Sequence, residues 1–198
     1  MKLPIKELLF CLTFAFASMA QAVEIAGVKV DESVQSQASN TTLKLNGAGI
    51  RYKIFFKVYV AALYLPETKN TTDGIFALPG QKRINLTMLR ELSSDTLGQA
   101  FMDGVKRNTD KVERAKLTDQ FIKFGQLFST VPELKKGDLI AMEWVPNVGT
   151  NMFINGKKIG DTFPDIAFFN AILRIWLGDN PVDVSLKNQL LGGSSDRH

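Results

Sequence analysis

The sequence contains one cysteine and one histidine, and both stand near the ends of the chain. Cys11 lies in the N-terminal segment and His198 is the last residue. A Ser-His-Asp triad, a Cys-His pair and histidine-based metal sites therefore lack the residues that they need. The acidic residues are spread along the chain, which also disfavours a metal site built from carboxylates. We expect no metal and no cofactor, so any catalysis would use arginine, tyrosine, lysine, carboxylates, hydroxyl groups or water.

Long apolar runs are missing as well, because no segment reaches the ~18 uninterrupted apolar residues of a membrane-spanning helix. Residues 1–22 instead have the pattern of a secretory signal peptide, with Lys2 and Lys6 before an apolar stretch and Ala20-Gln21-Ala22 as the cleavage site. Removal is expected before Val23. The only cysteine leaves with this segment, so the secreted chain has no disulfides, and a bacterial periplasm is the favoured location.

Charge of one sign is not concentrated anywhere in the sequence. The net charge is +4, and it falls to +3 when two lysines and one glutamate leave with the signal segment. The basic residues of "DGVKRNTDKVERAK" are mixed with acids, which is typical of solvated helix faces, so no nucleic-acid partner is expected. The segment "NGAG" at 46–49 lacks the remaining residues of a phosphate loop or dinucleotide fingerprint, and it indicates a bulge or bend in a strand.

Apolar periodicity predicts strands early and in the middle of the chain, with helices in blocks. This arrangement indicates an α+β fold around a largely antiparallel sheet. The first half of the chain is expected to form a strand or hairpin around Gly27, one or two strands over 43–65 and a strand over 84–89. A helix from Ser94 or Asp95 and a helix over about 111–128 follow. The rest is expected to form a meander of strands with a turn at Asn155-Gly156 and two C-terminal helices, which begin at Pro164 and Pro181, the last of them ending at Gly192.

One arginine stands at the head of the long apolar run "RYKIFFKVYVAALYL". If residues 50–65 form one strand and no bulge intervenes, Arg51 and Tyr59 share a face and Tyr64 lies on the other, because side chains alternate. Along a straight strand Arg51 and Tyr59 would be ~26 Å apart at ~3.3 Å per residue. They can converge only if the chain bends between them.

Three interpretations of this arginine remain open. Arg51 is exposed or paired with Glu91 or Asp95, because an unpaired buried guanidinium is costly. Alternatively, Arg51 lies at the inner end of an apolar cleft and holds a carboxylate or phenolate, with Tyr59 or Tyr64 as a neutral donor. In the third interpretation, the lysines at 53 and 57 form a patch for anionic lipid headgroups.

Three segments together resemble the chalcone isomerase-fold proteins, and most of all the bacterial secreted chalcone isomerase-like group. They are "LNGAGIRYKIFFKVYVAALYLPE", "KGDLIAMEWVPNVGTNMFINGKKIG" and "FNAILRIWLGDNPVDVSLKNQLLG". The resemblance implies an open-faced β-sandwich, in which a large antiparallel sheet is packed by helices beside a ligand cleft. It places one such domain at 23–192 and leaves 193–198 as a disordered tail.

The family also implies roles for individual residues. In its isomerases an arginine at the position of Arg51 orients a phenolate without a cofactor, and in its fatty-acid-binding relatives an arginine and a tyrosine hold a carboxylate. Here Tyr59 replaces a threonine of the isomerases, and "RELSSDTLGQAF" lacks their further tyrosine. Losing one preorganised donor typically costs ~10²–10³ in rate. The resemblance therefore favours a non-catalytic binder of an apolar carboxylate such as a fatty acid, with Arg51, Tyr59 and Tyr64 as ligand-binding residues.

Two alternatives remain. One is a cofactor-independent intramolecular lyase or isomerase acting on a phenolic, chalcone-like substrate, with Arg51 as its catalytic residue. The other is a structural or partner-binding protein of the cell envelope.

Overall fold

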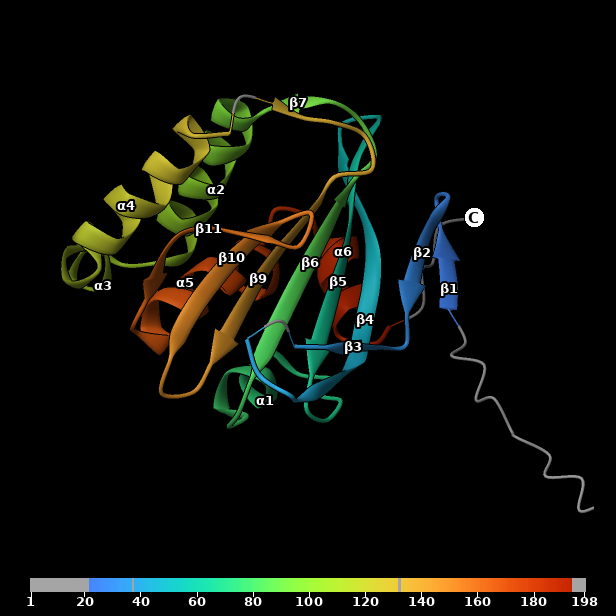
Figure 1. Cartoon of the computed structure of the whole chain (residues 1–198), viewed down its shortest axis with the longest axis horizontal. Coiled ribbons are helices and arrows are strands. Elements are labelled where there is room, and N and C mark those ends of the chain that lie inside the picture. The colour runs from blue at the N-terminus through green and yellow to red at the C-terminus, as the bar shows by residue number, and fades with distance from the viewer. Residues whose placement is uncertain (1–21, 37, 132, 194–198) are drawn as a thin grey trace, which may run out of the picture.

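A curled sheet of seven antiparallel strands organises the molecule, as Figure 1 shows for a computed structural model that describes residues 22–36, 38–131 and 133–193. The spatial order of the strands is β11-β10-β9-β6-β5-β4-β3. Their bounds are β3 (Ser33–Gln35), β4 (Thr42–Lys53), β5 (Phe56–Leu65), β6 (Lys82–Met88), β9 (Leu139–Val145), β10 (Gly149–Ile154) and β11 (Lys157–Phe163). The predicted α+β class and the large antiparallel sheet are confirmed.

Helices pack on one face of this sheet and enclose the main core (Figure 1). Their bounds are α1 (Thr72–Ala77), α2 (Ser94–Asn108), α3 (Lys111–Lys116), α4 (Thr118–Ser129), α5 (Ile166–Leu177) and α6 (Val184–Leu190). The predicted apolar stripe of α2 is buried, and the ring of Phe101 lies edge-on to that of Trp176 from α5 at 5.6 Å. Burial of such stripes against the sheet supplies most of the stability of these short helices.

A hairpin covers part of the opposite face. Strands β1 (Ala22–Ile25) and β2 (Val28–Asp31) are joined by Ala26 and Gly27, both with positive φ, as a tight hairpin turn requires. A second, smaller core lies on this face and includes Leu43, Val60 and Tyr64. The hairpin predicted around Gly27 is confirmed.

The apolar run around residues 43–65 forms two strands, β4 and β5, rather than one. They pair from Lys44 opposite Leu65 to Lys53 opposite Phe56, and a two-residue turn of Ile54 and Phe55 joins them. The bend that the sequence left open therefore occurs inside the apolar run. It brings residues that are distant along a straight strand to opposite positions on neighbouring strands.

Two glycines of β4 allow α6 to lie directly on the strand. A Cβ atom at Gly47 would be 2.1 Å from the Gln189 carbonyl oxygen, and one at Gly49 would be 1.7 Å from the Gln189 Oε1 atom. The predicted bulge in the "NGAG" segment is present between Leu45 and Gly47. Asn46, at the bulge, donates to the carbonyl oxygen of Leu190 at 2.7 Å. The glycines are needed here for close approach, and neither has a positive φ.

Other segments differ from the sequence-based expectation in detail. The helix predicted over 111–128 is divided into α3 and α4 at Leu117, whose φ of −106° and ψ of 10° are not helical. The last helix begins at Val184 after an Asp183 cap, and not at Pro181. Helix α1 and the short ladder of β7 (Leu92–Ser93) with β8 (Glu133–Leu134) were not predicted. The turn at Asn155-Gly156 is confirmed, since both residues have positive φ.

Two predicted segments lie almost wholly outside the described residues. They are the signal peptide at 1–22, of which only Ala22 is described, and the tail at 193–198, of which only Gly193 is described. Over residues 22–36, 38–131 and 133–193, no helix has both the length and the apolar character needed to cross a bilayer.

Candidate functional site

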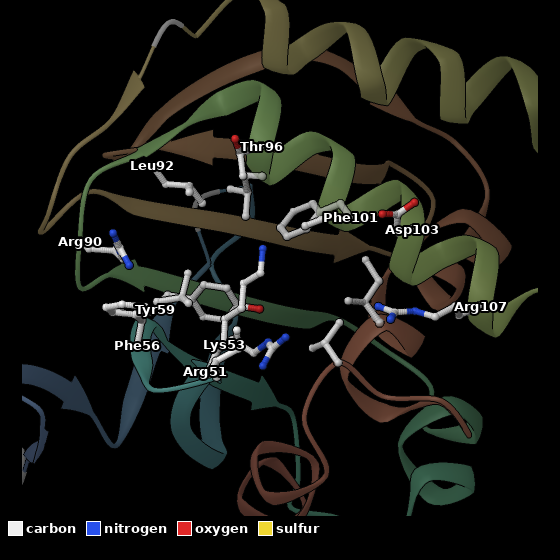
Figure 2. Close-up of a pocket in the computed structure, with 16 residues that line it drawn as sticks. Arg51, Lys53, Phe56, Tyr59, Arg90, Leu92, Thr96, Phe101, Asp103 and Arg107 are labelled. Atoms are coloured by element: carbon white, nitrogen blue, oxygen red, sulfur yellow. The ribbon is translucent and has the colours of Figure 1, made fainter.

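A pocket of about 540 Å³ lies between the β4–β5 hairpin and helix α2 (Figure 2). Its volume is within the range of about 300–1,000 Å³ that is usual for small-molecule sites. The walls are mostly apolar and come from the hairpin, from α2 and from the ends of α5 and its following loop. The apolar lining residues are Ile54, Phe56, Val58, Leu92, Leu97, Ala100, Phe101, Ile175 and Val182.

The pairing of β4 with β5 places Arg51 directly opposite Tyr59. Residues opposite each other on antiparallel strands have Cα atoms only about 4.5–5.5 Å apart and share a face. A bulge near Val58 is needed for this pairing, because Tyr52 pairs with Lys57 and Arg51 pairs with Tyr59. Arg51 and Tyr59 do share a face, although the prediction assumed one strand without a bulge and the structure has both a turn and a bulge between them. The hairpin turn removes the separation of a straight strand.

Arg51 is largely buried, with 21% of its side chain exposed, and its ion-pair partner is Asp183. The Nη1 and Oδ2 atoms are 3.7 Å apart, which is beyond hydrogen-bond distance. The carboxylate of Asp183 also accepts from the backbone N–H groups of Leu186 at 3.1 Å and Tyr52 at 3.2 Å. Asp183 thus caps α6 and holds the edge of β4, while the guanidinium of Arg51 still lines the pocket.

This pairing corrects one sequence-based interpretation. Glu91 and Asp95 were the candidate partners of Arg51, and the structure gives it Asp183 instead. The partner comes from the cap of α6, which reaches Arg51 because Gly47 and Gly49 let that helix approach β4 closely.

Tyr59 lines the same pocket and is 4% exposed. Its hydroxyl oxygen accepts a hydrogen bond from the indole Nε1 of Trp176 at 3.0 Å. Burial raises the pKa of the Tyr59 phenol to about 12, although the bond from Trp176 and the positive charge of Arg51 act in the opposite direction. The phenol therefore stays protonated near neutral pH, and because Trp176 occupies a lone pair, its own proton remains to be donated.

Tyr64 is placed on the opposite face of the sheet, in the small core under the β1–β2 hairpin. It is 2% exposed, and its hydroxyl donates to the backbone carbonyl oxygen of Asp31 at 3.2 Å. Burial raises the pKa of Tyr64 to about 12, and the nearby Asp31 carboxylate contributes in the same direction. The structure therefore brings Arg51 and Tyr59 together in one pocket but does not bring Tyr64 to it.

Charged residues that were not among the predicted ligand-binding residues also line the pocket. They are Lys53, Arg90 and Arg107, with Asp103 as the acidic side chain in the lining that the structure describes. Figure 2 shows Asp103 and Arg107 on α2, across the pocket from the hairpin. These two residues are four apart on one helical face and both are exposed, so no local signal in the sequence distinguishes them from the solvated face of the helix.

This arrangement is suited to hydrogen-bond donation toward an anion. A guanidinium and a neutral phenol lie side by side, and the lining has more cations than carboxylates. In the described ranges, no group of three or more cysteine, histidine, aspartate or glutamate residues could hold a metal ion. The cationic and phenolic side chains of the lining are therefore suited to binding a negatively charged head group beside apolar walls.

A family model described as chalcone isomerase-like matches residues 22–192, and the chain belongs to this family. The fold is similar to that of a crystal structure of a fatty-acid binding protein from Arabidopsis thaliana, with a TM-score of 0.62 and 16% sequence identity. The match covers 81% of this chain and 96% of the plant chain. At this level of identity the similarity concerns the fold. No curated protein sequence matches the chain.

Proposed function

We propose that this protein is a non-catalytic, periplasmic binder of an apolar carboxylic acid such as a fatty acid. The observation that carries the proposal is the pairing of Arg51 with Tyr59 at one apolar pocket. The similarity of the fold to a protein described as fatty-acid binding supports the same class of ligand.

The chemistry of the pair explains why a carboxylate is the preferred head group. The planar guanidinium of Arg51 offers several N–H donors, and Tyr59 adds one O–H donor that burial keeps protonated. A carboxylate has two oxygens and can accept from both side chains at once, whereas a neutral ester or alcohol lacks the attraction between opposite charges that a carboxylate has with the guanidinium. The acyl chain then lies along the apolar side chains of the hairpin and α2.

Asp183 does not cancel this preference. Its carboxylate is engaged by the backbone N–H groups of Leu186 and Tyr52, and its distance of 3.7 Å from Arg51 leaves a loose ion pair. The cations Lys53, Arg90 and Arg107 add positive charge around the same cavity. The pocket should therefore attract an anion even with Asp183 in place.

The first experiment is mass spectrometry of an organic extract of the purified protein, which should contain a long-chain carboxylic acid. The second is titration of a fatty acid into wild type, Arg51→Gln and Arg174→Gln. Arg174 is a matched control, because it is also an ion-paired arginine, bonded to Glu113 at 2.6 Å, but does not line the pocket.

Loss of a charge-assisted bond typically costs about 1.5–3 kcal/mol, which is roughly a tenfold or greater loss of affinity. We expect this loss in Arg51→Gln and an affinity within about twofold of wild type in Arg174→Gln. An empty pocket together with equal affinities in all three proteins would remove the proposal.

The periplasmic location is part of this proposal and is supported by the pattern of residues 1–22. N-terminal sequencing of protein released by osmotic shock should begin at Val23. Uncleaved protein confined to the cytosol would contradict it.

A cofactor-independent isomerase acting on a phenolic substrate is supported less well. Of the three tyrosines of the chain, Tyr59 is the one that lines the pocket, and its pKa of about 12 makes it a donor and not a base. The Arg51 and Tyr59 pair can bind a phenolate, but it offers little of the proton-transfer chemistry that an efficient cyclisation uses.

A further inference from the structure

The tip of the β4–β5 hairpin exposes three consecutive large apolar side chains. Ile54 is 78% exposed, Phe55 is 90% exposed and Phe56 is 59% exposed. The other strongly exposed apolar side chains of the described residues are single ones on separate elements, which is normal for protein surfaces. A contiguous apolar tip at the end of a sheet is not explained by folding.

The backbone of the tip adds a second observation. Ile54 has a φ of 58°, in the left-handed region that a β-branched residue adopts only at a cost. The first position of a two-residue hairpin turn with positive φ is usually glycine or asparagine. Strain of this kind persists mainly where a side chain is needed for function. The chain thus keeps an exposed isoleucine where the turn itself favours glycine.

Cations surround this apolar tip. Lys53 and Lys57 flank it and are exposed, and the guanidinium of Arg90 lies over the ring of Phe56 at 5.0 Å from its centroid. The segment "RYKIFFKV" contains three basic residues and no acid. An apolar tip ringed by lysine and arginine is complementary to a bilayer surface with anionic headgroups, which places negative charge directly above an apolar layer.

The tip is also continuous with the mouth of the pocket. Lys53, Ile54 and Phe56 line the cavity as well as being exposed, and Figure 2 shows Lys53 and Phe56 beside Tyr59 and Arg90. A surface that docks on the tip therefore lies next to the opening of the cavity.

We propose that the hairpin tip, residues 53–57, docks the protein on an anionic lipid bilayer by inserting Ile54 and Phe55 between headgroups that pair with Lys53, Lys57 and Arg90. Docking does not require a ligand in the pocket. Its consequence, that an apolar acid passes between bilayer and pocket without crossing water, rests on the proposed function.

The test is co-sedimentation with phosphatidylcholine vesicles that contain or lack phosphatidylglycerol. The protein is used in the form in which cells accumulate it, so that every variant has the same N-terminus. The variants are Phe55→Asn and Lys57→Gln, neither of which lines the pocket. Val148→Asn is the matched control, because Val148 is a 54% exposed apolar residue in the β9–β10 turn at the opposite end of the sheet.

Wild type should bind the anionic vesicles and bind pure phosphatidylcholine more weakly, with binding reduced by added salt. Burying one phenylalanine side chain is worth enough to give a loss of about tenfold or more for Phe55→Asn. Lys57→Gln should lose a few-fold on anionic vesicles only, and Val148→Asn should match wild type. Absence of wild-type binding, or equal binding by Phe55→Asn, overturns the proposal.

Two further measurements separate this proposal from others. Fatty-acid affinity without vesicles should be the same in Phe55→Asn and wild type. A failure to bind vesicles would then leave the proposed fatty-acid ligand unaffected, and a failure to bind fatty acid would leave the docking proposal unaffected. Ile54→Gly should melt at a higher temperature than wild type while binding vesicles more weakly. If sedimentation without vesicles instead shows a dimer that Phe55→Asn abolishes, the tip binds a second copy and the bilayer proposal is wrong.

Discussion

Replacement of Asp183 by asparagine removes the charge opposite Arg51 and keeps the cap of α6, but one of the two carboxylate oxygens becomes an amide nitrogen. The Asp183 carboxylate caps α6 through Leu186, accepts from the backbone of Tyr52 and lies 3.7 Å from the guanidinium of Arg51. Asparagine is an equally good N-cap residue and is nearly the same size. The substitution therefore removes the charge together with the hydrogen bond from the backbone N–H of Tyr52, because the amide nitrogen in place of Oδ2 cannot accept.

The expected magnitude follows from the geometry of the pair. Unit charges at this distance interact with about 1 kcal/mol in water and about 4 kcal/mol at an effective dielectric constant of about 20. A carboxylate ligand that faces Arg51 from the pocket lies further from Asp183, so the lower figure applies to their repulsion. Removing it should tighten ligand binding by up to about 1 kcal/mol, or up to about fivefold. The free energy of unfolding should fall by about 1–2 kcal/mol, since one partly exposed ion pair and the hydrogen bond from the backbone N–H of Tyr52 are lost.

Isothermal titration of a fatty acid into wild type, Asp183→Asn and Asp183→Ala measures the effect. Asp183→Ala also loses the helix cap, so it should be less stable than Asp183→Asn by about 1 kcal/mol in urea unfolding. Binding to Asp183→Asn should be tighter than to wild type, most clearly at low salt. Weaker binding would refute this reasoning, because it would mean that Asp183 positions Arg51 for the ligand and does not compete with it.

Three other outcomes are expected. Gly47→Ala should lower the free energy of unfolding by about 2 kcal/mol, because its Cβ meets the backbone oxygen of Gln189. Gly49→Ala should cost less than Gly47→Ala, because its closest contact is the movable end of the Gln189 side chain and only the Cβ of Gln189, at 2.9 Å, resists; urea unfolding compares the two. Burial raises the pKa of Tyr59 and Tyr64 to about 12 in the folded protein, so unfolding above pH 10 releases protons. The free energy of unfolding should therefore fall by about 2 kcal/mol per tyrosine between pH 10 and pH 12. Denaturant midpoints measured across this range should show half of the combined fall in Tyr64→Phe. Chalcone cyclisation followed by absorbance should be no faster with the protein than in buffer, and a clear acceleration would favour the isomerase alternative.

Much of the fold was predictable because local periodicity and turn chemistry agree with it. The apolar stripe of α2 and the positive-φ turns at Gly27 and Asn155-Gly156 are local signals, and all three are present. The turn at Ile54 could not be read from the sequence, because neither it nor Phe55 is a turn-forming residue and the apolar run continues through both. The break at Leu117 was hidden for a similar reason, since leucine is a good helix former.

The candidate site was predictable only where it depends on the strand. Arg51 and Tyr59 were placed on one face by alternation, and two changes cancel to keep this result. The two-residue turn pairs Lys53 with Phe56 and shifts the alternation once, and the bulge near Val58 shifts it back. Tyr64 falls on the other face by the same alternation. The counter-ion Asp183 depends on tertiary packing and has no local signal.

The β4–β5 hairpin explains why the two proposed functions occur at one place. Its bulge brings Arg51 and Tyr59 together inside the pocket, while its two-residue turn puts Ile54 and Phe55 outside at the mouth. The register of β4 with β5 fixes both the Arg51–Tyr59 pair and the turn residues Ile54 and Phe55. A slip of this register by one residue would move one side chain of the pair to the other face of the sheet and would place different residues in the turn. The proposed recognition of an acid and the proposed contact with its lipid source therefore both depend on this one hairpin. Helix α2 supplies a wall of the pocket, and the Asp183 cap of α6 supplies the counter-ion of Arg51.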